Sequence, residues 1–263
     1  RLILGFIQQY PSLCKPSNFN FQETDVCIID LNKVTQDTGP EGTRRTTIAY
    51  MVSRYLLGKA LDEQKKTLAH FFDDILAYKL FPDKPDAYVV QTPFANLGVL
   101  PSDPRLEDLQ IKLESRYKMY KLREALDSFK GFDEVFIDTP PALNFYTRSA
   151  LIAADTCLIP FDCDDFSRHA LYKLMDSVRE IQADHNHALR IEGIVVNHYQ
   201  ARANLPVRLV EELRSEGLPV LDAFLSASVK IRESHAQALP MIHLDPRHKL
   251  TREFEALYQV LAT

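Results

Sequence analysis

The sequence has 263 residues, of which 46% are hydrophobic and 25% charged, and its formal net charge is −5. This length suits one large α/β domain better than two ordinary ones, and the composition is typical of a globular protein. The acidic balance excludes a protein that coats nucleic acid over its whole surface, so any nucleic-acid binding must use a local patch. We find no apolar stretch of the ~20 residues that span a membrane and no signal peptide, and we expect a cytoplasmic protein.

Cysteine and histidine do not form a recognisable metal-binding pattern. The four cysteines are Cys14, Cys27, Cys157 and Cys163, and none belongs to a C-x-x-C pair. Cys27 and Cys157 lie inside apolar runs, where cysteine usually acts as a small hydrophobic residue. The eight histidines show no H-E-x-x-H spacing. Composition therefore does not predict a metal cluster.

Short apolar runs without alternation predict parallel strands that are buried on both faces. These runs cover residues 26–29, 97–100, 135–137, 157–159, 194–196 and 220–224. Apolar residues at helical spacing predict helices between them, over residues 106–129, 167–181, 205–216 and 251–261. Because strands and helices alternate, the predicted fold class is α/β, a doubly wound, mostly parallel sheet with helices on both faces.

The start of the chain fits this pattern least well. Residues 2–10 resemble the last turns of a helix, and residues 11–25 are polar and irregular. A doubly wound domain begins with a strand that is followed by a helix. We therefore expect the sequence to begin partway through that first helix.

The most specific segment is residues 131–141, which read GFDEVFIDTPP. Its apolar strand ends in Asp138, and ligands of open α/β sheets bind at the carboxyl edge of the strands. A carboxylate at that edge can hold Mg²⁺ through water beside nucleotide phosphates. It can equally cap the turn that follows. The segment thus indicates either a nucleotide site at Asp138, Thr139 and Pro140 or a capped turn.

Several segments, in order, resemble the ParA/MinD family of P-loop ATPases. Residues 131–141 resemble its Walker-B and switch II region; the others are 144–155 (NFYTRSALIAAD), 157–162 (CLIPFD), 191–197 (IEGIVVN), 228–234 (SVKIRES) and 244–249 (LDPRHK). The resemblance implies one ParA-like ATPase domain over residues 1–263. Its parts are an irregular start over 1–25, a switch I-like region over 26–60 and the best-matching core over 97–263.

Residues 26–36, VCIIDLNKVTQ, resemble the switch I strand of this family, VLLIDLDPQ. The resemblance assigns Asp30 to the first aspartate. It places Asn32 where the family has a second aspartate, which positions the attacking water. Asparagine has the same shape without the charge, so it is a poorer base or water orienter. The alternative is an insertion that shifts this alignment.

The defining phosphate loop of the family, K-G-G-x-G-K-[ST], cradles phosphates with backbone N–H groups at a helix N-terminus. It should precede the helix expected at residues 2–10, so the loop is either outside this sequence or lost. Residues 39–47, GPEGTRRTT, occupy a similar context before the helical stretch 48–57. They miss the required spacing, and Pro40 removes an N–H donor. We interpret them as a polar switch-region loop, with anion binding as the alternative.

The resemblance further implies ATP and Mg²⁺ as cofactors, a homodimer, a ParB-like stimulating protein, nonspecific DNA binding and association with the nucleoid. It also implies that Asn197 contacts the adenine base. Candidate DNA-binding residues are Arg202, Arg208, Arg214, Lys230, Arg232, Arg247, Lys249 and Arg252. Each can equally belong to an ordinary solvated helix face. The chain lacks the basic amphipathic C-terminal helix of the MinD branch, so we expect no membrane partner.

Three functions remain open at this stage. The first is a ParA-type ATPase that segregates plasmid or chromosomal DNA. The second is a relative that binds DNA or protein but has lost nucleotide turnover. The third is a metabolic P-loop or Rossmann-type enzyme, and the lack of G-x-G-x-x-G and of a nucleophile–base pair weighs against it.

Overall fold

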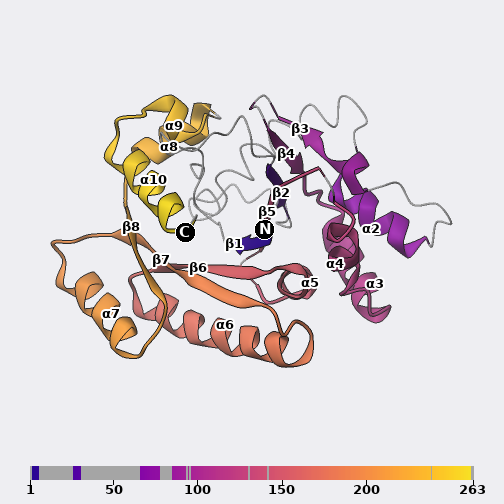
Figure 1. The fold of residues 1–263 in the computed structure, drawn as a ribbon, viewed down its shortest axis with the longest axis horizontal. Helices are drawn as coiled ribbons and strands as arrows, with labels where there is room; N and C mark the ends of the chain where they lie inside the picture. The colour runs from indigo at the N-terminus through magenta and orange to yellow at the C-terminus, as the bar shows by residue number, and fades with distance from the viewer. Residues whose placement is uncertain are drawn as a thin grey trace.

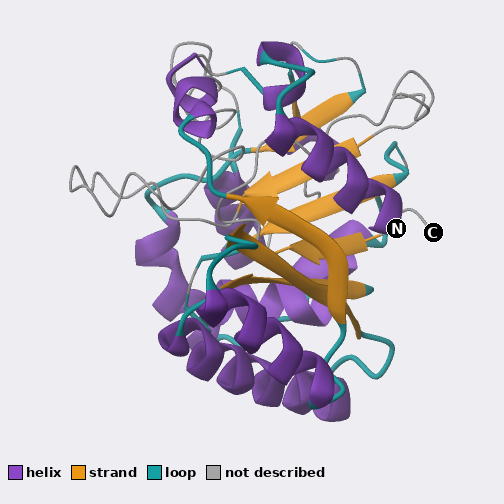
Figure 2. Ribbon diagram, turned by 90° about the vertical axis from the view of Figure 1, so that its left-hand side faces the viewer, coloured by secondary structure: helices purple, strands orange, loops and turns teal. Residues whose placement is uncertain are grey.

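In the computed structural model, the described residues are 2–5, 26–30, 66–77, 85–92, 94, 96–129, 131–140, 142–237 and 239–261. Within them, an eight-stranded sheet has the order β3-β4-β2-β5-β1-β6-β7-β8 (Figure 1). Every neighbouring pair is parallel except β3 with β4. Helices cover both faces of this sheet (Figure 2). The predicted doubly wound α/β fold is therefore confirmed.

The strands are β1 (Leu2–Gly5), β2 (Val26–Asp30), β3 (Val90–Gln91), β4 (Leu97–Leu100), β5 (Glu134–Asp138), β6 (Thr156–Asp162), β7 (Arg190–Tyr199) and β8 (Val220–Ser226). The helices of the described residues are α2 (Leu68–Leu76), α3 (Leu106–Ser115), α4 (Lys121–Leu126), α5 (Phe145–Ala153), α6 (Asp165–Asp184), α7 (Asn204–Ser215), α8 (Lys230–Gln237), α9 (Met241–Leu244) and α10 (Lys249–Leu261). A short 3₁₀ helix covers Pro85–Tyr88. Among these helices, none is both long enough and apolar enough to cross a membrane.

All six predicted strands are present, but the expectation for the start of the chain is wrong. Leu2–Gly5 forms β1, a central strand between β5 and β6, and not the end of a helix. A run of four residues is too short for its periodicity to separate a buried strand from a helix segment. The first described strand therefore lies in the middle of the sheet.

The helix predicted over residues 106–129 is also corrected, because it is two helices, α3 and α4. Tyr117 has a positive φ of 53° between them. The backbone N–H of Lys118 donates to the carbonyl of Leu113 at 3.0 Å, which closes the end of α3 in the manner of a Schellman turn. Glycine usually occupies such a left-handed position. Because the position holds a tyrosine, the sequence gives no sign that the helix ends there.

Successive side chains of the central strands point to opposite faces of the sheet. Ile137 of β5 and Ile159 of β6 pack into a core with residues of α2 through α7. Phe136 and Leu158, each one position earlier in its strand, pack into a second core with α9 and α10. This period of two explains why each strand is apolar throughout.

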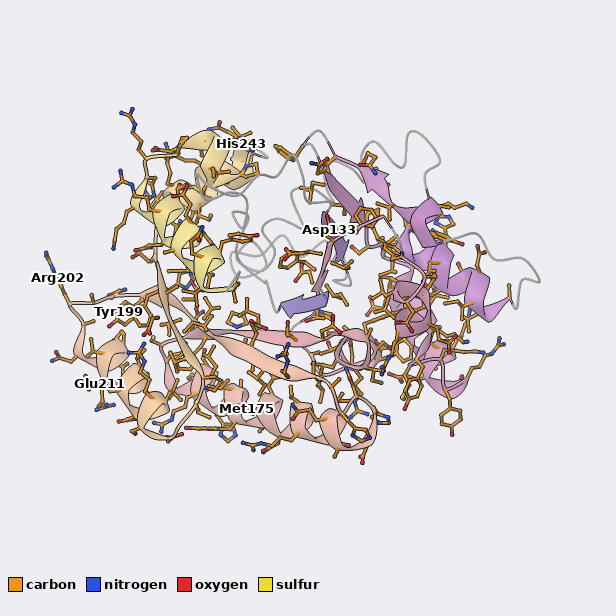
Figure 3. The ribbon with its side chains drawn as sticks, in the orientation of Figure 1. Asp133, Met175, Tyr199, Arg202, Glu211 and His243 are labelled. Atoms are coloured by element: carbon orange, nitrogen blue, oxygen red, sulfur yellow. The ribbon has the colours of Figure 1, made fainter. Side chains whose placement is uncertain are left out.

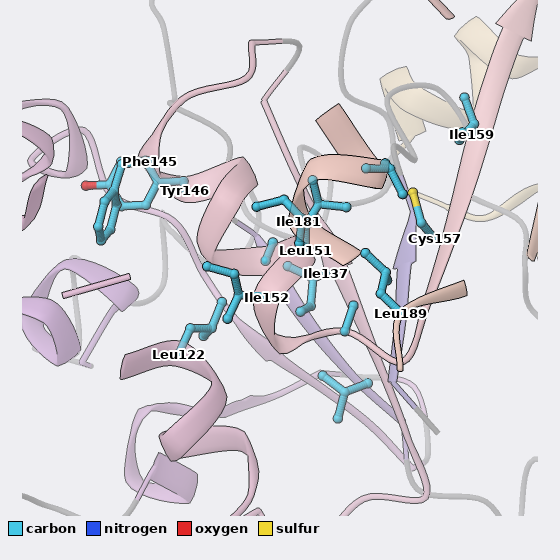
Figure 4. Packing of buried hydrophobic residues seen from close by; sticks show 14 of the residues in the cluster. Leu122, Ile137, Phe145, Tyr146, Leu151, Ile152, Cys157, Ile159, Ile181 and Leu189 are labelled. Carbon is cyan, nitrogen blue, oxygen red and sulfur yellow. The ribbon is translucent and has the colours of Figure 1, made fainter. Parts of the chain in front are cut away.

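Helix α5 anchors the loop that follows β5. The side chain of Asn144 caps the helix by accepting hydrogen bonds from the backbone N–H groups of Tyr146 and Thr147. Tyr146 is fully buried, and its hydroxyl donates to the carbonyl of Leu106. Leu151 is likewise fully buried in the core behind β5 (Figure 4). The packing of α5 therefore fixes the position of the chain just after Asp138.

Strand β7 contains an irregularity that shapes the edge of the sheet. Cys157 of β6 pairs with Ile191, but the next residue, Leu158, pairs with Gly193, so β7 carries one extra residue. A Cβ atom on Gly193 would lie 2.4 Å from the side chain of Leu221 in β8. Glycine fits here because the side chain of Leu221 occupies the space that a Cβ atom would need.

Candidate functional site

Three strands end side by side at the carboxyl edge of the sheet. Asp30, the last residue of β2, is the register partner of Asp138, the last residue of β5. Gly5, the last residue of β1, pairs with Asp138 on its other side. Ligands of open parallel sheets bind at this edge. The fold therefore places Asp138 between two strand ends where a ligand would lie.

The residues at this edge fit a magnesium ion held through water. Asp138 has only 3% of its surface exposed, and Thr139 is fully buried. The hydroxyl of Thr139 has no hydrogen-bond partner among the described residues. Buried polar atoms almost always have a partner, so a ligand or water would satisfy this one. Mg²⁺ prefers oxygen ligands and usually keeps several waters beside one or two carboxylates.

A second pair of polar residues lies where β6 and β7 end. Asp162 and Asn197 are register partners, and Asn197 is buried. The side-chain oxygen of Asn197 accepts a hydrogen bond from the backbone N–H of His198 at 2.6 Å. The Nδ1 atom of His198 lies 3.4 Å from an Asp162 oxygen. Asp162 was missed by the sequence analysis, although it is a strand-ending aspartate like Asp138.

Asp162 and His198 interact electrostatically. Burial acts to raise the pKa of Asp162, but the interaction with His198 and a hydrogen bond from Asn197 outweigh it, so this pKa lies below its usual range. His198 has a positive φ of 49°, in the left-handed region that side chains rarely adopt. The backbone thus holds the imidazole of His198 beside the carboxylate of Asp162 at the strand ends.

The candidate DNA-binding residues fall into two groups. Some form ion pairs: Arg208 with Glu212, Arg214 with Asp222, Lys230 with Glu233 and Lys249 with Glu253. Others are exposed and form no ion pair with another described residue: Arg202, Arg232, Arg247 and Arg252. Arg202 extends away from the body of the molecule on the loop that follows β7 (Figure 3). The structure does not gather these cations around Asp138.

Part of the predicted site lies outside the described residues. This holds for Asn32, for the loop over residues 39–47 and for the helical stretch 48–57. Asp30 is described only by its backbone position in β2. Pro140 is buried directly after Thr139.

Comparison with known proteins decides the family. Residues 40–191, more than half of the chain, match a family model described as an AAA domain. The chain is 30% identical to the sporulation initiation inhibitor protein Soj of Bacillus subtilis over 177 residues, which cover 65% of this chain and 70% of Soj. It belongs to the ParA family of P-loop ATPases. The chromosome partitioning protein ParA of Caulobacter vibrioides is also 30% identical, over 161 residues.

The Caulobacter alignment covers 59% of this chain and 60% of that ParA protein, so the match spans less than two thirds of the relative's length. Solved structures agree with the fold. Apo McdA from Cyanothece has a TM-score of 0.71 at 16% identity, with 99% of each chain covered. A putative plasmid partition protein from Borrelia burgdorferi, bound to AMPPNP, has a TM-score of 0.71 at 15% identity and covers 100% of this chain and 98% of its own.

Family membership makes the residues after β1 informative. A P-loop follows a strand directly and precedes a helix, with the pattern G-x-x-x-x-G-K-[ST]. After Gly5 the sequence reads FIQQYPSLCKPSNF, and the next glycine is Gly39. The expectation that the loop precedes residue 2 is wrong, because residues 2–5 form the strand β1 and a P-loop follows its strand. The sequence that follows this ParA-like strand does not carry the family's phosphate motif.

Proposed function

We propose that this chain is a ParA-type partition protein. It binds ATP and Mg²⁺ at the carboxyl edge of its sheet, forms a nucleotide-dependent homodimer and binds DNA nonspecifically, and so positions or segregates a plasmid or chromosome. The observation that carries this proposal is the register of Asp30, Asp138 and Gly5 at that edge, in a chain of the ParA family. The protein would act in the cytoplasm, on the nucleoid.

The proposed nucleotide site assigns a role to each residue at the edge. Asp138 would hold Mg²⁺ through water, and Thr139 and Pro140 would lie beside the phosphates. When bound, the ion would neutralise phosphate charge. Asp30 and Asn32 would orient water from switch I, and Asn197 would face the base. The orphan hydroxyl of Thr139 supports these assignments, because it requires a partner from outside the described residues.

The proposed DNA surface lies in the C-terminal part of the chain. Its residues are Arg202, Arg208, Arg214, Lys230, Arg232, Lys249 and Arg252. Cations that contact phosphates release condensed counterions, so affinity should fall steeply with salt. A ParB-like protein would stimulate hydrolysis of ATP. The exposed arginines without an ion pair support this surface most directly, since they need not break an existing contact to reach a phosphate.

The test is ATP hydrolysis with and without duplex DNA, together with duplex binding over a range of salt concentrations. We expect hydrolysis that DNA stimulates and a linear fall of log affinity with log salt. An affinity that hardly changes between low and moderate salt would exclude the nonspecific electrostatic mode. Because hydrolysis and DNA binding are both measured on the same protein, a failure of one can be told from a failure of the other.

A second candidate is a ParA-like DNA- or protein-binding relative without nucleotide turnover. Two sequence observations favour it: Asn32 stands in place of an aspartate, and no glycine follows β1 until Gly39. The variant Asn32→Asp separates the candidates. If ATP is bound, the restored carboxylate should raise turnover by about 100-fold, the scale of general-base catalysis. If the variant stays as inactive as wild type and ATP does not bind, the second candidate is correct.

A further inference from the structure

A pocket of about 340 Å³ opens at the β8 edge of the sheet, away from Asp138. It lies between the end of β7, the strand β8 and helix α10, and its walls include Tyr199, Phe224, Ser226, Lys249 and Glu253. This volume falls within the ~300–1,000 Å³ typical of small-molecule sites. None of these wall residues except Lys249 belongs to the sites proposed above.

One wall of this pocket is aromatic. The rings of Tyr199 and Phe224 stack with centroids 4.6 Å apart and planes 24° from parallel. The guanidinium of Arg214 lies over the ring of Phe224, 5.5 Å from its centroid. Both rings are only half buried. A planar ligand ring can therefore extend an existing stack, which is how nucleobases bind aromatic side chains.

The opposite end of the pocket is polar. The carboxylate of Glu253 accepts hydrogen bonds from the backbone N–H of Ser226 at 2.8 Å and from its hydroxyl at 2.7 Å. The ammonium of Lys249 donates to the Ser226 hydroxyl at 2.8 Å. The Lys249 side chain is still 75% exposed. An ammonium has three N–H donors, so Lys249 can also donate to a ligand.

Two arginines lie close in the chain to residues that line the pocket. Arg202 follows Ala201, which lines the pocket, and Figure 3 shows Arg202 projecting beyond Tyr199. Arg252 lies three positions after Lys249 on α10, on the same side of the helix. Both are exposed, and neither forms an ion pair with another described residue. An aromatic wall with exposed cations near it matches the chemistry of one nucleotide, a planar base joined to phosphates.

We propose that this pocket binds an unpaired nucleotide of a DNA strand. The base stacks on Tyr199, Lys249 donates to the base or its sugar, and the flanking phosphates contact Arg202 and Arg252. This inference rests on the proposed DNA binding and adds a preference to it. Single strands and frayed ends bind more tightly than a blunt duplex, because a paired base cannot enter the pocket.

The experiment measures the fluorescence anisotropy of a labelled oligothymidine strand and of a blunt duplex of equal length, with the full chain at one salt concentration. Tyr199→Ala should weaken binding of the single strand by about 5- to 150-fold, the effect of losing one base–aromatic stack, and should leave duplex binding unchanged. Tyr199→Phe should retain wild-type affinity. Tyr117→Ala is the matched control, because Tyr117 is 84% exposed and lies on the distant turn after α3.

A second variant covers the case in which Tyr199→Ala does not fold. Ala256→Leu fills the pocket from the exposed side of α10 and should also weaken only the single strand. Unchanged single-strand affinity in a folded variant of either kind would overturn the proposal. Competition by thymidine monophosphate at the affinity of the strand would assign the pocket to a free nucleotide instead. If wild type binds neither DNA, the proposed function itself fails, which is a different result.

Discussion

Two parts of the same sheet edge differ in how far their polar and charged side chains are buried. At β5 the polar groups are few and buried, with Asp138 only 3% exposed and Thr139 fully buried. Beyond β7 they are numerous and exposed, and Arg202 and Arg252 lie in solvent. A buried charge interacts strongly because water does not screen it, whereas an exposed charge is screened by solvent and salt. Single substitutions should therefore have large effects in the first region and small, cumulative ones in the second.

The largest effect should come from the core that supports the buried region. Leu151→Ala removes a fully buried side chain of α5, behind the loop that follows Asp138. The free energy of unfolding should fall by about 2–5 kcal/mol because a cavity remains. Val260→Ala, at a 39% exposed position of α10, should change it by less than about 0.5 kcal/mol. Chemical denaturation measures the free energy of unfolding of both variants. Equal losses in the two would contradict the expected difference between the buried and the exposed region.

The next effect concerns Asp138 itself. Asp138→Asn keeps the shape of the side chain and removes the charge that would hold Mg²⁺ through water. Hydrolysis of ATP should fall by about 10- to 100-fold, the usual effect of losing an outer-shell partner of a metal. Circular dichroism should show an unchanged fold. Turnover equal to that of wild type would remove Asp138 from the site.

A smaller effect is expected on the exposed surface. Arg252→Ala should reduce the slope of log affinity for duplex DNA against log salt by about 0.9, the share of one phosphate contact. Lys230→Ala should change the slope less, because Lys230 already pairs with Glu233 at 2.7 Å. Binding isotherms at several salt concentrations measure this difference. Identical slopes for the two variants would show that ion pairing does not set the contribution of these cations.

The smallest effect is a pH dependence at helix α2. The backbone N–H of Thr67 donates to Nδ1 of His70 at 3.0 Å, which completes a capping box in which histidine replaces the usual glutamate or glutamine. Burial lowers the pKa of His70, and the charge of Arg105 lowers it further. The carboxylates that act in the opposite direction belong to Asp103, Asp73 and Asp74.

Since the folded protein favours neutral His70, the unfolded chain binds more protons between the lowered pKa and the usual value of about 6.5. The contribution of His70 to stability is thus present above pH ~6.5 and is lost as the pH falls through the folded pKa. His70→Gln keeps a capping acceptor that does not titrate. Its melting temperature should fall less than that of wild type below pH ~6.5. If the melting temperatures of the two proteins fell equally with pH, this role of His70 would be refuted.

Much of the fold follows from the sequence, because buried parallel strands are apolar throughout and easy to recognise. The exceptions have physical causes. Leu2–Gly5 is too short to show a period, and Tyr117 takes a left-handed conformation in which glycine is expected. Asp138 was found because it ends a strand, and the same signal at Asp162 was overlooked.

The pocket beside β8 could not be predicted from sequence. Tyr199 and Phe224 are far apart in the chain and meet only because β7 pairs with β8. That pairing shifts its register twice along β7, so a regular ladder would misplace the two rings. The contact depends on the tertiary structure alone.

The edge formed by Gly5, Asp30 and Asp138 should bind ATP with Mg²⁺. Equilibrium dialysis of labelled ATP against the full chain, with and without Mg²⁺, tests it most directly. We predict saturable binding at one site per chain that Mg²⁺ strengthens and that Asp138→Asn makes insensitive to Mg²⁺. No binding by folded wild-type protein would contradict the claim and leave a ParA-family protein that acts without a nucleotide.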